Sequence, residues 1–162
     1  MGKRSRDKGA RHERWVARTL ADATGLDIRR TAGQCRQGSD APDVEAPGVW
    51  LECKVGARPD PVKAYTQGIQ ASDGRPVVVV WKKDRHAAQA TLRLRTLTTL
   101  WPVERIGHEL DGPLVTLPFD AFVGLYASVY ATQDQDPEEA ARTREIRGLS
   151  GMGRGVKGNR GG

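Results

Sequence analysis

Two acids and a lysine stand close together in the middle of the chain, in the stretch 39–55, which reads SDAPDVEAPGVWLECKV. Asp43 follows a proline, and Glu52 and Lys54 are separated by a single residue. Carboxylates hold hard cations such as Mg²⁺, and a lysine beside them can stabilise the negative charge of a developing oxyanion. These residue types therefore suit metal-assisted hydrolysis. Taken alone the pattern is not specific, because charged residues at alternate strand positions usually form only a solvated face.

A β-hairpin is the element that would bring these residues together. The run 49–55 alternates along a predicted strand, and a side-chain period of two puts Glu52 and Lys54 on one face. Asp43 begins the preceding strand, and the Ala-Pro-Gly segment at 46–48 is short enough to fold that strand back. The hairpin would gather all three side chains at one place.

A third acid is predicted on the first helix, which we expect over residues 8–24 with Asp7 as its capping residue. Glu13, Val16 and Leu20 fall at i, i+3 and i+7, so they share one helix face. An acid on an apolar stripe is either paired with a cation or functional. Glu13 could therefore reach the place where the hairpin gathers its charged residues.

The other predicted elements alternate between strands and helices. They are a strand over 26–32, a polar loop over 33–41, a helix over 62–72 with Val62, Tyr65 and Ile69 on one face, a strand buried on both faces over 76–81, an edge or DNA-facing strand over 91–97 with Arg93 and Arg95 outward, a strand over 113–117 and a helix over 119–131. The aromatic stripe of this last helix is expected in the core, with a dimer contact as the alternative.

The charge is unevenly distributed along the 162 residues, whose net charge is +6. Residues 1–14 hold six basic residues against two acidic ones, and residues 148–162 hold three basic residues and no acid. The basic surplus therefore lies at the two ends. Such ends are typical of arms that meet a polyanion, and nucleic acid is the expected partner; the alternative is that they serve only solubility.

Length and composition predict one domain with flanking segments. The expected divisions are a basic N-terminal arm over 1–7, a single domain over 8–132, a C-terminal helix over 133–148 and a disordered, glycine- and arginine-rich tail over 149–162. No apolar run is long enough for a membrane span, and no hydrophobic stretch follows the basic N-terminus. The two cysteines, Cys35 and Cys53, have no metal or redox spacing. We therefore expect a cytoplasmic protein without a disulfide framework or a membrane partner.

Four short motifs, in order, resemble those of a known family. The segment 8–14, KGARHER, is similar to the Lys-Gly-x-x-x-Glu-Arg opening of the first helix in archaeal-type Holliday junction resolvases, and 30–33, RTAG, is similar to their Arg-Ser-Ala-Gly. Pro-Asp at 42–43 and Glu-Cys-Lys at 52–54 resemble the PD-(D/E)xK nuclease signature. The predicted order of helix, strand, hairpin, helix and buried strand also matches that family's core. The resemblance covers roughly residues 6–85.

The resemblance implies an α/β fold with a restriction-endonuclease-like core, in which a central mixed β-sheet is flanked by helices. The catalytic residues it implies are Glu13, Asp43, Glu52 and Lys54. It implies that Mg²⁺, with Mn²⁺ as a substitute, is held by Asp43, Glu52 and the backbone carbonyl of Cys53, and that Glu13 reaches the metal through a water. No organic cofactor is expected.

The resemblance also implies a DNA-binding surface and an assembly. The implied DNA-binding residues are Lys8, Arg11, Arg14, Arg30, Thr31 and Ser39. Thr31 replaces the family's usual serine, and the loop 34–41 is longer than expected, so the place of Ser39 differs from the family pattern. In related nucleases a glutamine on the next helix helps the site. Gln67 or Gln70 could fill that place, but helical spacing puts Gln67 nearly opposite the predicted apolar face, so neither is assigned.

The function implied is that of a Holliday junction resolvase, a homodimer that cuts two strands of a four-way DNA junction symmetrically. The implied place of action is the cytoplasm or, if the protein is phage-encoded, the host cytoplasm. Two alternatives stay open. One is another PD-(D/E)xK endonuclease, of the repair, restriction-like or phage type, because fold does not settle substrate. The other is a DNA-binding module whose nuclease motif is degenerate, although all four motif residues are present here.

Overall fold

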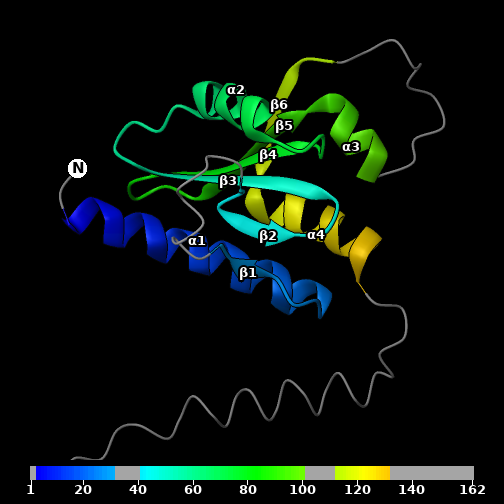
Figure 1. Ribbon diagram of the computed structural model, residues 1–162, viewed down its shortest axis with the longest axis horizontal. Helices are drawn as coiled ribbons and strands as arrows, with labels where there is room; N and C mark the ends of the chain where they lie inside the picture. Colours follow the sequence, from blue (N-terminus) through cyan, green and yellow to red (C-terminus); the bar gives the residue numbers. More distant parts are fainter. Residues whose placement is uncertain (1–2, 32–40, 101–111, 132–162) are drawn as a thin grey trace, which may run out of the picture. The chain divides into compact units, whose positions relative to one another are not determined.

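A mixed β-sheet forms the centre of the chain in the computed structural model, which describes residues 3–31, 41–100 and 112–131 (Figure 1). The elements are α1 (Lys3–Thr24), β1 (Arg29–Arg30), β2 (Val44–Ala46), β3 (Val49–Gly56), α2 (Pro61–Ala71), β4 (Val77–Lys83), β5 (Ala88–Arg93), α3 (Leu94–Leu100), β6 (Leu114–Pro118) and α4 (Phe119–Tyr130). The predicted C-terminal helix 133–148 and the tail 149–162 lie outside the described residues, as does most of the predicted loop 33–41.

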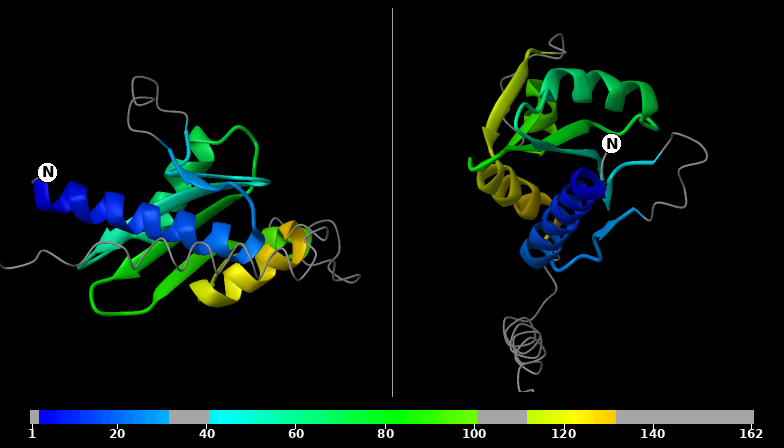
Figure 2. Two further views of the ribbon diagram at one scale, coloured as in Figure 1. Left: turned by 90° about the horizontal axis from the view of Figure 1, so that it is seen from below. Right: turned by 90° about the vertical axis from the view of Figure 1, so that its left-hand side faces the viewer.

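The six strands are arranged in the sheet in the order in which they occur in the chain. β1, β2 and β3 are antiparallel to one another, β4 is parallel to β3, and β5 and β6 continue antiparallel. The parallel pair needs a crossover connection, which α2 supplies on one face of the sheet. α1 and α4 cover the opposite face (Figure 2). The predicted α/β class, with a mixed sheet flanked by helices, is therefore confirmed.

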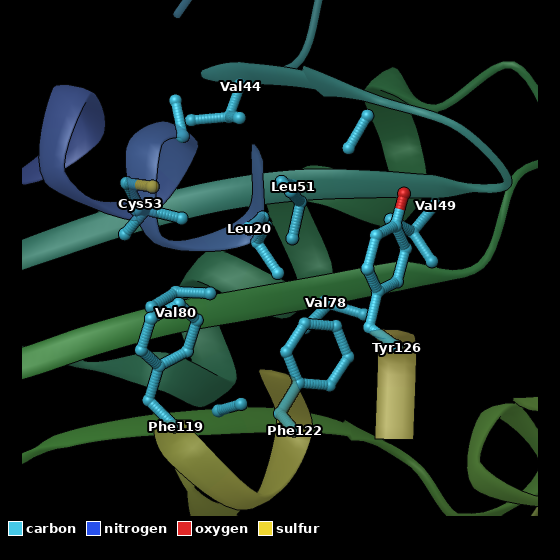
Figure 3. Close-up of a cluster of buried hydrophobic side chains, with 14 of the residues drawn as sticks. Leu20, Val44, Val49, Leu51, Cys53, Val78, Val80, Phe119, Phe122 and Tyr126 are labelled. Atoms are coloured by element: carbon cyan, nitrogen blue, oxygen red, sulfur yellow. The ribbon is translucent and has the colours of Figure 1, made fainter. Parts of the chain in front are cut away.

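Two hydrophobic clusters pack against the two faces of β3 and β4. On the α1 and α4 side lie residues from all the central strands and both helices, among them Leu20, Val44, Leu51, Val78, Val80 and Phe122 (Figure 3). On the α2 side lie Trp50, Ala64, Tyr65, Val77 and Val79. The valines of β4 thus point alternately to the two clusters, which confirms the prediction of a strand buried on both faces.

The β2–β3 hairpin turns through Pro47 and Gly48, as predicted, and α4 holds this turn in place. Gly48 has a φ of 70°, in the left-handed region that favours glycine. The Tyr126 hydroxyl donates a hydrogen bond of 2.8 Å to the Pro47 carbonyl. A Cβ on Gly48 would lie 1.8 Å from the Tyr130 hydroxyl oxygen, so the turn has no room for a side chain. The aromatic residues of α4 therefore serve the core, as expected.

The N-terminal prediction is corrected in one respect. α1 begins at Lys3, so residues 3–7 of the predicted arm are helical and Asp7 does not cap the helix. The physical reason is that arginine and lysine are good helix formers, and no proline or glycine interrupts 3–8. The other end of the helix agrees with the prediction. Gly25 follows it with a φ of 74° and donates a backbone hydrogen bond to the Ala21 carbonyl.

The predicted strand over 91–97 is wrong. β5 ends at Arg93, the next residue begins α3, and β5 lies between β4 and β6 rather than at an edge. The spacing of Leu94 and Leu97 also suits a helix, and Leu97 packs against the core. Arg93 does not face outward: its guanidinium lies 5.8 Å from the Tyr65 ring centroid and donates to the Gly112 carbonyl at 2.7 Å.

Two other elements differ from their predicted form. The strand predicted over 26–32 pairs with β2 only at β1, two residues long. α2 has nearly its predicted bounds but buries a different face, because Val62 and Ile69 are 57% and 51% exposed. Its buried residues are Ala64, Tyr65 and Gly68. The small residues on either side of Tyr65 let the helix lie close to the sheet, and this outweighs the burial of two larger apolar side chains.

Candidate active site

Asp43 is fixed at the start of β2 by the two neighbouring strands. Its backbone N–H donates to the Leu51 carbonyl at 2.9 Å, and its carbonyl accepts from the Thr31 N–H at 3.1 Å. Its side-chain Oδ2 accepts from the Cys53 N–H at 2.8 Å. The carboxylate therefore lies against β3 between Glu52 and Lys54, where the sequence predicted it.

Glu52 and Lys54 share the α2-facing side of β3, as predicted. The Lys54 Nζ lies 3.4 Å from Glu52 Oε2, and the Trp50 indole Nε1 donates to Glu52 Oε1 at 3.1 Å. Gly68 of α2 lies directly opposite, since a Cβ there would stand 3.2 Å from Glu52 Cγ. The Glu52 carboxylate is thus oriented by an indole, an ammonium group and a closely packed helix.

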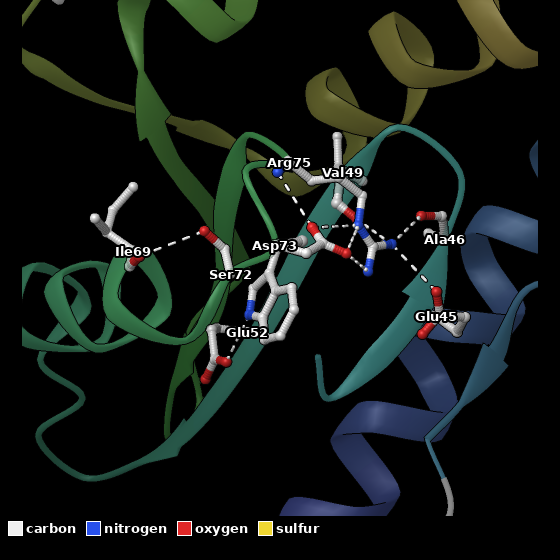
Figure 4. A network of polar contacts seen from close by, with 9 residues as sticks. Glu45, Ala46, Val49, Glu52, Ile69, Ser72, Asp73 and Arg75 are labelled. Atoms are coloured by element: carbon white, nitrogen blue, oxygen red, sulfur yellow. Dashed lines mark hydrogen bonds and ion pairs between the residues drawn. The ribbon is translucent and has the colours of Figure 1, made fainter. Parts of the chain in front are cut away.

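Arg75 supports this arrangement from the turn that precedes β4 (Figure 4). Its guanidinium lies 5.6 Å from the centroid of the buried Trp50 ring. It also donates to Glu45 Oε1 and to the carbonyls of Ala46 and Val49 at 3.2 to 3.4 Å. The cation–π contact and the three hydrogen bonds attach both strands of the hairpin to the α2–β4 connection. Trp50, and through it Glu52, is consequently held in one position.

Glu13 reaches the site from the opposite face of the sheet. It is buried on α1 and forms an ion pair with Arg30 Nε, with side-chain exposures of 11% and 27%. Gly9, one turn earlier, lies beside the carboxylate: a Cβ there would stand in ordinary van der Waals contact with Glu13 Oε1, at 3.7 Å. Arg30 therefore orients Glu13 in this structure. The contact of Arg30 with DNA stays a prediction.

The other three predicted catalytic residues act electrostatically on Asp43. Burial raises the pKa of Asp43, the Cys53 N–H and the Lys54 charge oppose this shift, and the charges of Glu52 and Glu13 add to it. Burial also raises the pKa of the Cys53 thiol well above its ordinary value, and the three acids raise it further. Glu13 of α1 thus acts electrostatically on the hairpin site formed by Asp43, Glu52 and Lys54.

The donor set at this place fits a hard cation. Among the described residues no three His, Cys, Asp or Glu side chains converge as a ready-made metal cluster. Mg²⁺, however, is usually bound by one or two carboxylates and keeps several waters, so it does not require such a cluster. Asp43, Glu52 and the carbonyl of Cys53 supply suitable oxygens. A cation would also relieve the carboxylate repulsion that helps to raise the Asp43 pKa.

The predicted DNA-binding residues are spread over several surroundings. Lys8 forms an ion pair with Asp84 in the β4–β5 turn, and Arg11 and Arg14 are exposed on α1. The buried Oγ1 of Thr31 has no hydrogen-bond partner among the described residues. Ser39 lies outside the described residues. Of the predicted DNA-binding residues that the structure describes, Arg30 and Thr31 are the two that lie beside the predicted catalytic residues.

A pocket beside Lys54 was missed by the sequence reasoning. It has a volume of about 300 Å³ and lies between the end of β3 and the start of α2. Arg58, Lys63 and Gln67 line it together with Lys54. Gln67 lines the pocket because α2 buries the face of Ala64, Tyr65 and Gly68 rather than the predicted face of Val62, Tyr65 and Ile69. The sequence signal for the face that α2 buries is the pair of small residues at 64 and 68, which lie at i−1 and i+3 from Tyr65.

Comparison of the chain with protein-family models, with curated proteins and with solved structures gave no match. The resemblance to junction resolvases therefore rests on the motifs themselves. In the described part of the chain, no helix combines the length and the apolar character that crossing a bilayer requires.

Proposed function

We propose that the chain is a metal-dependent DNA endonuclease, and that its substrate is the four-way junction. The observation that carries this proposal is the hairpin site formed by Asp43, Glu52 and Lys54, on which Glu13 of α1 acts electrostatically. Two carboxylates and a lysine in one partly buried place, with a further acid nearby, suit phosphodiester hydrolysis, in which a cation and a positive side chain stabilise a developing negative charge.

Each side chain has a distinct role in this proposal. Asp43, Glu52 and the Cys53 carbonyl would hold Mg²⁺ or Mn²⁺, which when bound activates a water and neutralises phosphate charge. Lys54, held beside Glu52, stabilises the additional negative charge on the phosphoryl oxygens. Glu13, fixed by Arg30, accepts a hydrogen bond from a water at the site and so helps to orient it.

The arrangement of the elements supports the nuclease assignment. α1, three antiparallel strands, the crossover helix α2 and a fourth strand parallel to β3 follow one another along the chain. This order agrees with the core implied by the resemblance to PD-(D/E)xK nucleases. Symmetric cutting of a junction requires two active sites, for which a two-fold homodimer is the simplest assembly.

The test is cleavage of a panel of labelled DNAs in Mg²⁺: an immobile four-way junction, a flap, a duplex and a single strand. We expect the junction to be cut at paired, symmetric positions and the other three to be cut slowly. Equal cutting of duplex or flap would favour another endonuclease of the same type. No Mg²⁺- or Mn²⁺-dependent cutting of any DNA would contradict the proposal. Asp120→Asn, an exposed acid in the first turn of α4 and outside the candidate site, provides a control that should cut normally.

A further inference from the structure

The pocket beside Lys54 has the chemistry of an anion site. Three of the side chains that line it are cationic, Lys54, Arg58 and Lys63, against a single acid, Asp60. Gln67 adds an amide that can donate hydrogen bonds. Arginine and lysine together are the usual partners of phosphate oxygens in proteins. We call this site, defined by these five residues, the Lys63 pocket.

The single acid that lines the pocket has a structural role. Asp60 caps α2, and its Oδ1 accepts a hydrogen bond of 2.9 Å from the Lys63 N–H. Because the Asp60 side chain already accepts this N–H at the start of α2, the helix backbone is not the group that would attract an anion. The positive side chains of Arg58 and Lys63 are exposed and line the pocket. An anion would therefore be held by side chains that belong to the loop after β3 and to the first turn of α2.

Lys54 connects the Lys63 pocket to the candidate active site. Its ammonium group lies 3.4 Å from Glu52 Oε2 and its side chain lines the pocket. Because Lys54 belongs to both sites, the pocket lies next to the place where a phosphate at Asp43 and Glu52 would stand. The volume of about 300 Å³ is at the lower end of the range for sites that hold one small ligand.

We propose that the Lys63 pocket binds the phosphate adjacent to the scissile phosphate on the cleaved DNA strand. This inference rests on the proposed nuclease function. It adds where the cleaved strand runs beside the candidate active site. Strand polarity decides which side of the cut the pocket occupies. The pocket holds the strand in register, and Arg58 and Lys63 are positioning residues rather than catalytic ones.

The first experiment measures binding without cleavage. A fluorescent four-way junction is titrated in EDTA at several salt concentrations with the wild-type chain, with Arg58→Gln/Lys63→Gln and with the charge-matched control Arg18→Gln/Arg29→Gln. Both control positions are exposed and neither lines the pocket. Relative to the control, the pocket variant should bind about tenfold more weakly, the loss expected for charge-assisted hydrogen bonds. Its plot of log K against log[salt] should be less steep by about 0.9, the value for one phosphate contact.

The second experiment locates the phosphate. Single neutral methylphosphonate linkages are placed at each position flanking the cut, and single-turnover cleavage is measured with wild type and with Arg58→Gln/Lys63→Gln. In the wild type a neutral linkage next to the cut should slow cleavage about tenfold. The pocket variant should lose that sensitivity, because the two changes remove the same contact.

The outcomes separate the two claims. A pocket variant that binds no more weakly than the control, or that keeps the wild-type methylphosphonate profile, overturns the pocket assignment and leaves the nuclease proposal standing. If the wild type cuts no DNA, the nuclease proposal fails. The binding comparison in EDTA then decides alone whether the Lys63 pocket holds a nucleic-acid phosphate.

Discussion

Gly68 of α2 packs against the candidate catalytic glutamate, so replacing it tests the packing of the site. A Cβ at this position would stand 2.7 Å from Val77 Cγ1 and 3.2 Å from Glu52 Cγ. Carbon atoms in contact prefer about 3.5 to 4.0 Å. In Gly68→Ala, α2 or its neighbours must therefore move by about 1 Å, and Glu52 lies on one side of that movement.

The expected loss of stability follows from two opposing effects. Overpacking of a closely packed interface costs about 1–3 kcal/mol. Replacing glycine by alanine within a helix recovers up to about 1 kcal/mol. The free energy of unfolding should therefore fall by about 1 kcal/mol. Displacing Glu52 by about 1 Å should slow cleavage on the order of 100-fold, because catalytic geometry tolerates little error.

Gly124 in α4 offers a matched control. A Cβ there would meet nothing within 4 Å, so Gly124→Ala should gain about 1 kcal/mol and cut DNA at the normal rate. Urea denaturation of the two variants should thus differ by about 2 kcal/mol, and single-turnover cleavage of the junction should differ as stated above. Equal stability of both variants, with normal cleavage by Gly68→Ala, would refute the claim that Gly68 sets the position of Glu52.

Three further predictions concern the residues around the site. Burial raises the pKa of Asp43 above its ordinary 3.8, so the folded protein loses stability as the pH rises through the folded-state pKa and this carboxyl ionises. Asp43→Asn, which cannot ionise, should therefore raise the urea midpoint at pH 7.5. The gain should shrink toward pH 4, where the carboxyl becomes protonated. Arg30→Gln leaves the Glu13 carboxylate buried without its partner and should lower the free energy of unfolding by about 2 kcal/mol. Arg29→Gln, whose ion pair is exposed, should leave the free energy of unfolding unchanged. Tyr126→Phe removes one hydrogen bond to the hairpin turn and should cost about 1 kcal/mol.

Each of these has a result that would contradict it. A destabilised Asp43→Asn at pH 7.5 would mean that ionisation of this carboxyl is favoured by folding. Arg29→Gln and Arg30→Gln with equal stability would show that the Glu13 ion pair contributes nothing. Tyr126→Phe with wild-type stability would show that α4 does not anchor the turn. Chemical denaturation followed by circular dichroism measures all of them.

The hairpin and the strand β4 could be predicted because their signals are local. A period of two over 49–55 and a run of four valines at 77–80 leave few alternatives. Glu13 could also be placed on the sheet-facing side of α1, because its apolar neighbours repeat at helical spacing. These three features determine most of the candidate site.

The remaining features depend on contacts between distant parts of the chain. The pairing of Glu13 with Arg30 requires β1 to lie beside α1, which no local pattern specifies. The run 91–97 alternates like a strand yet has leucines at helical spacing, and only its place beside β4 and β6 decides where the strand ends. The Lys63 pocket depends on which face α2 buries, and small residues at 64 and 68 decided this against two larger apolar ones.

The central claim is that the acids beside Lys54 hold a metal that cuts DNA, and one measurement tests it most directly. Wild type and Glu52→Gln are compared on an immobile four-way junction in Mg²⁺, with both cut positions mapped and junction affinity measured in EDTA. The account predicts symmetric cuts by the wild type, none by Glu52→Gln, and affinities within about threefold, because the substitution keeps the size of the side chain and removes one charge. Undiminished cutting by Glu52→Gln would contradict the account.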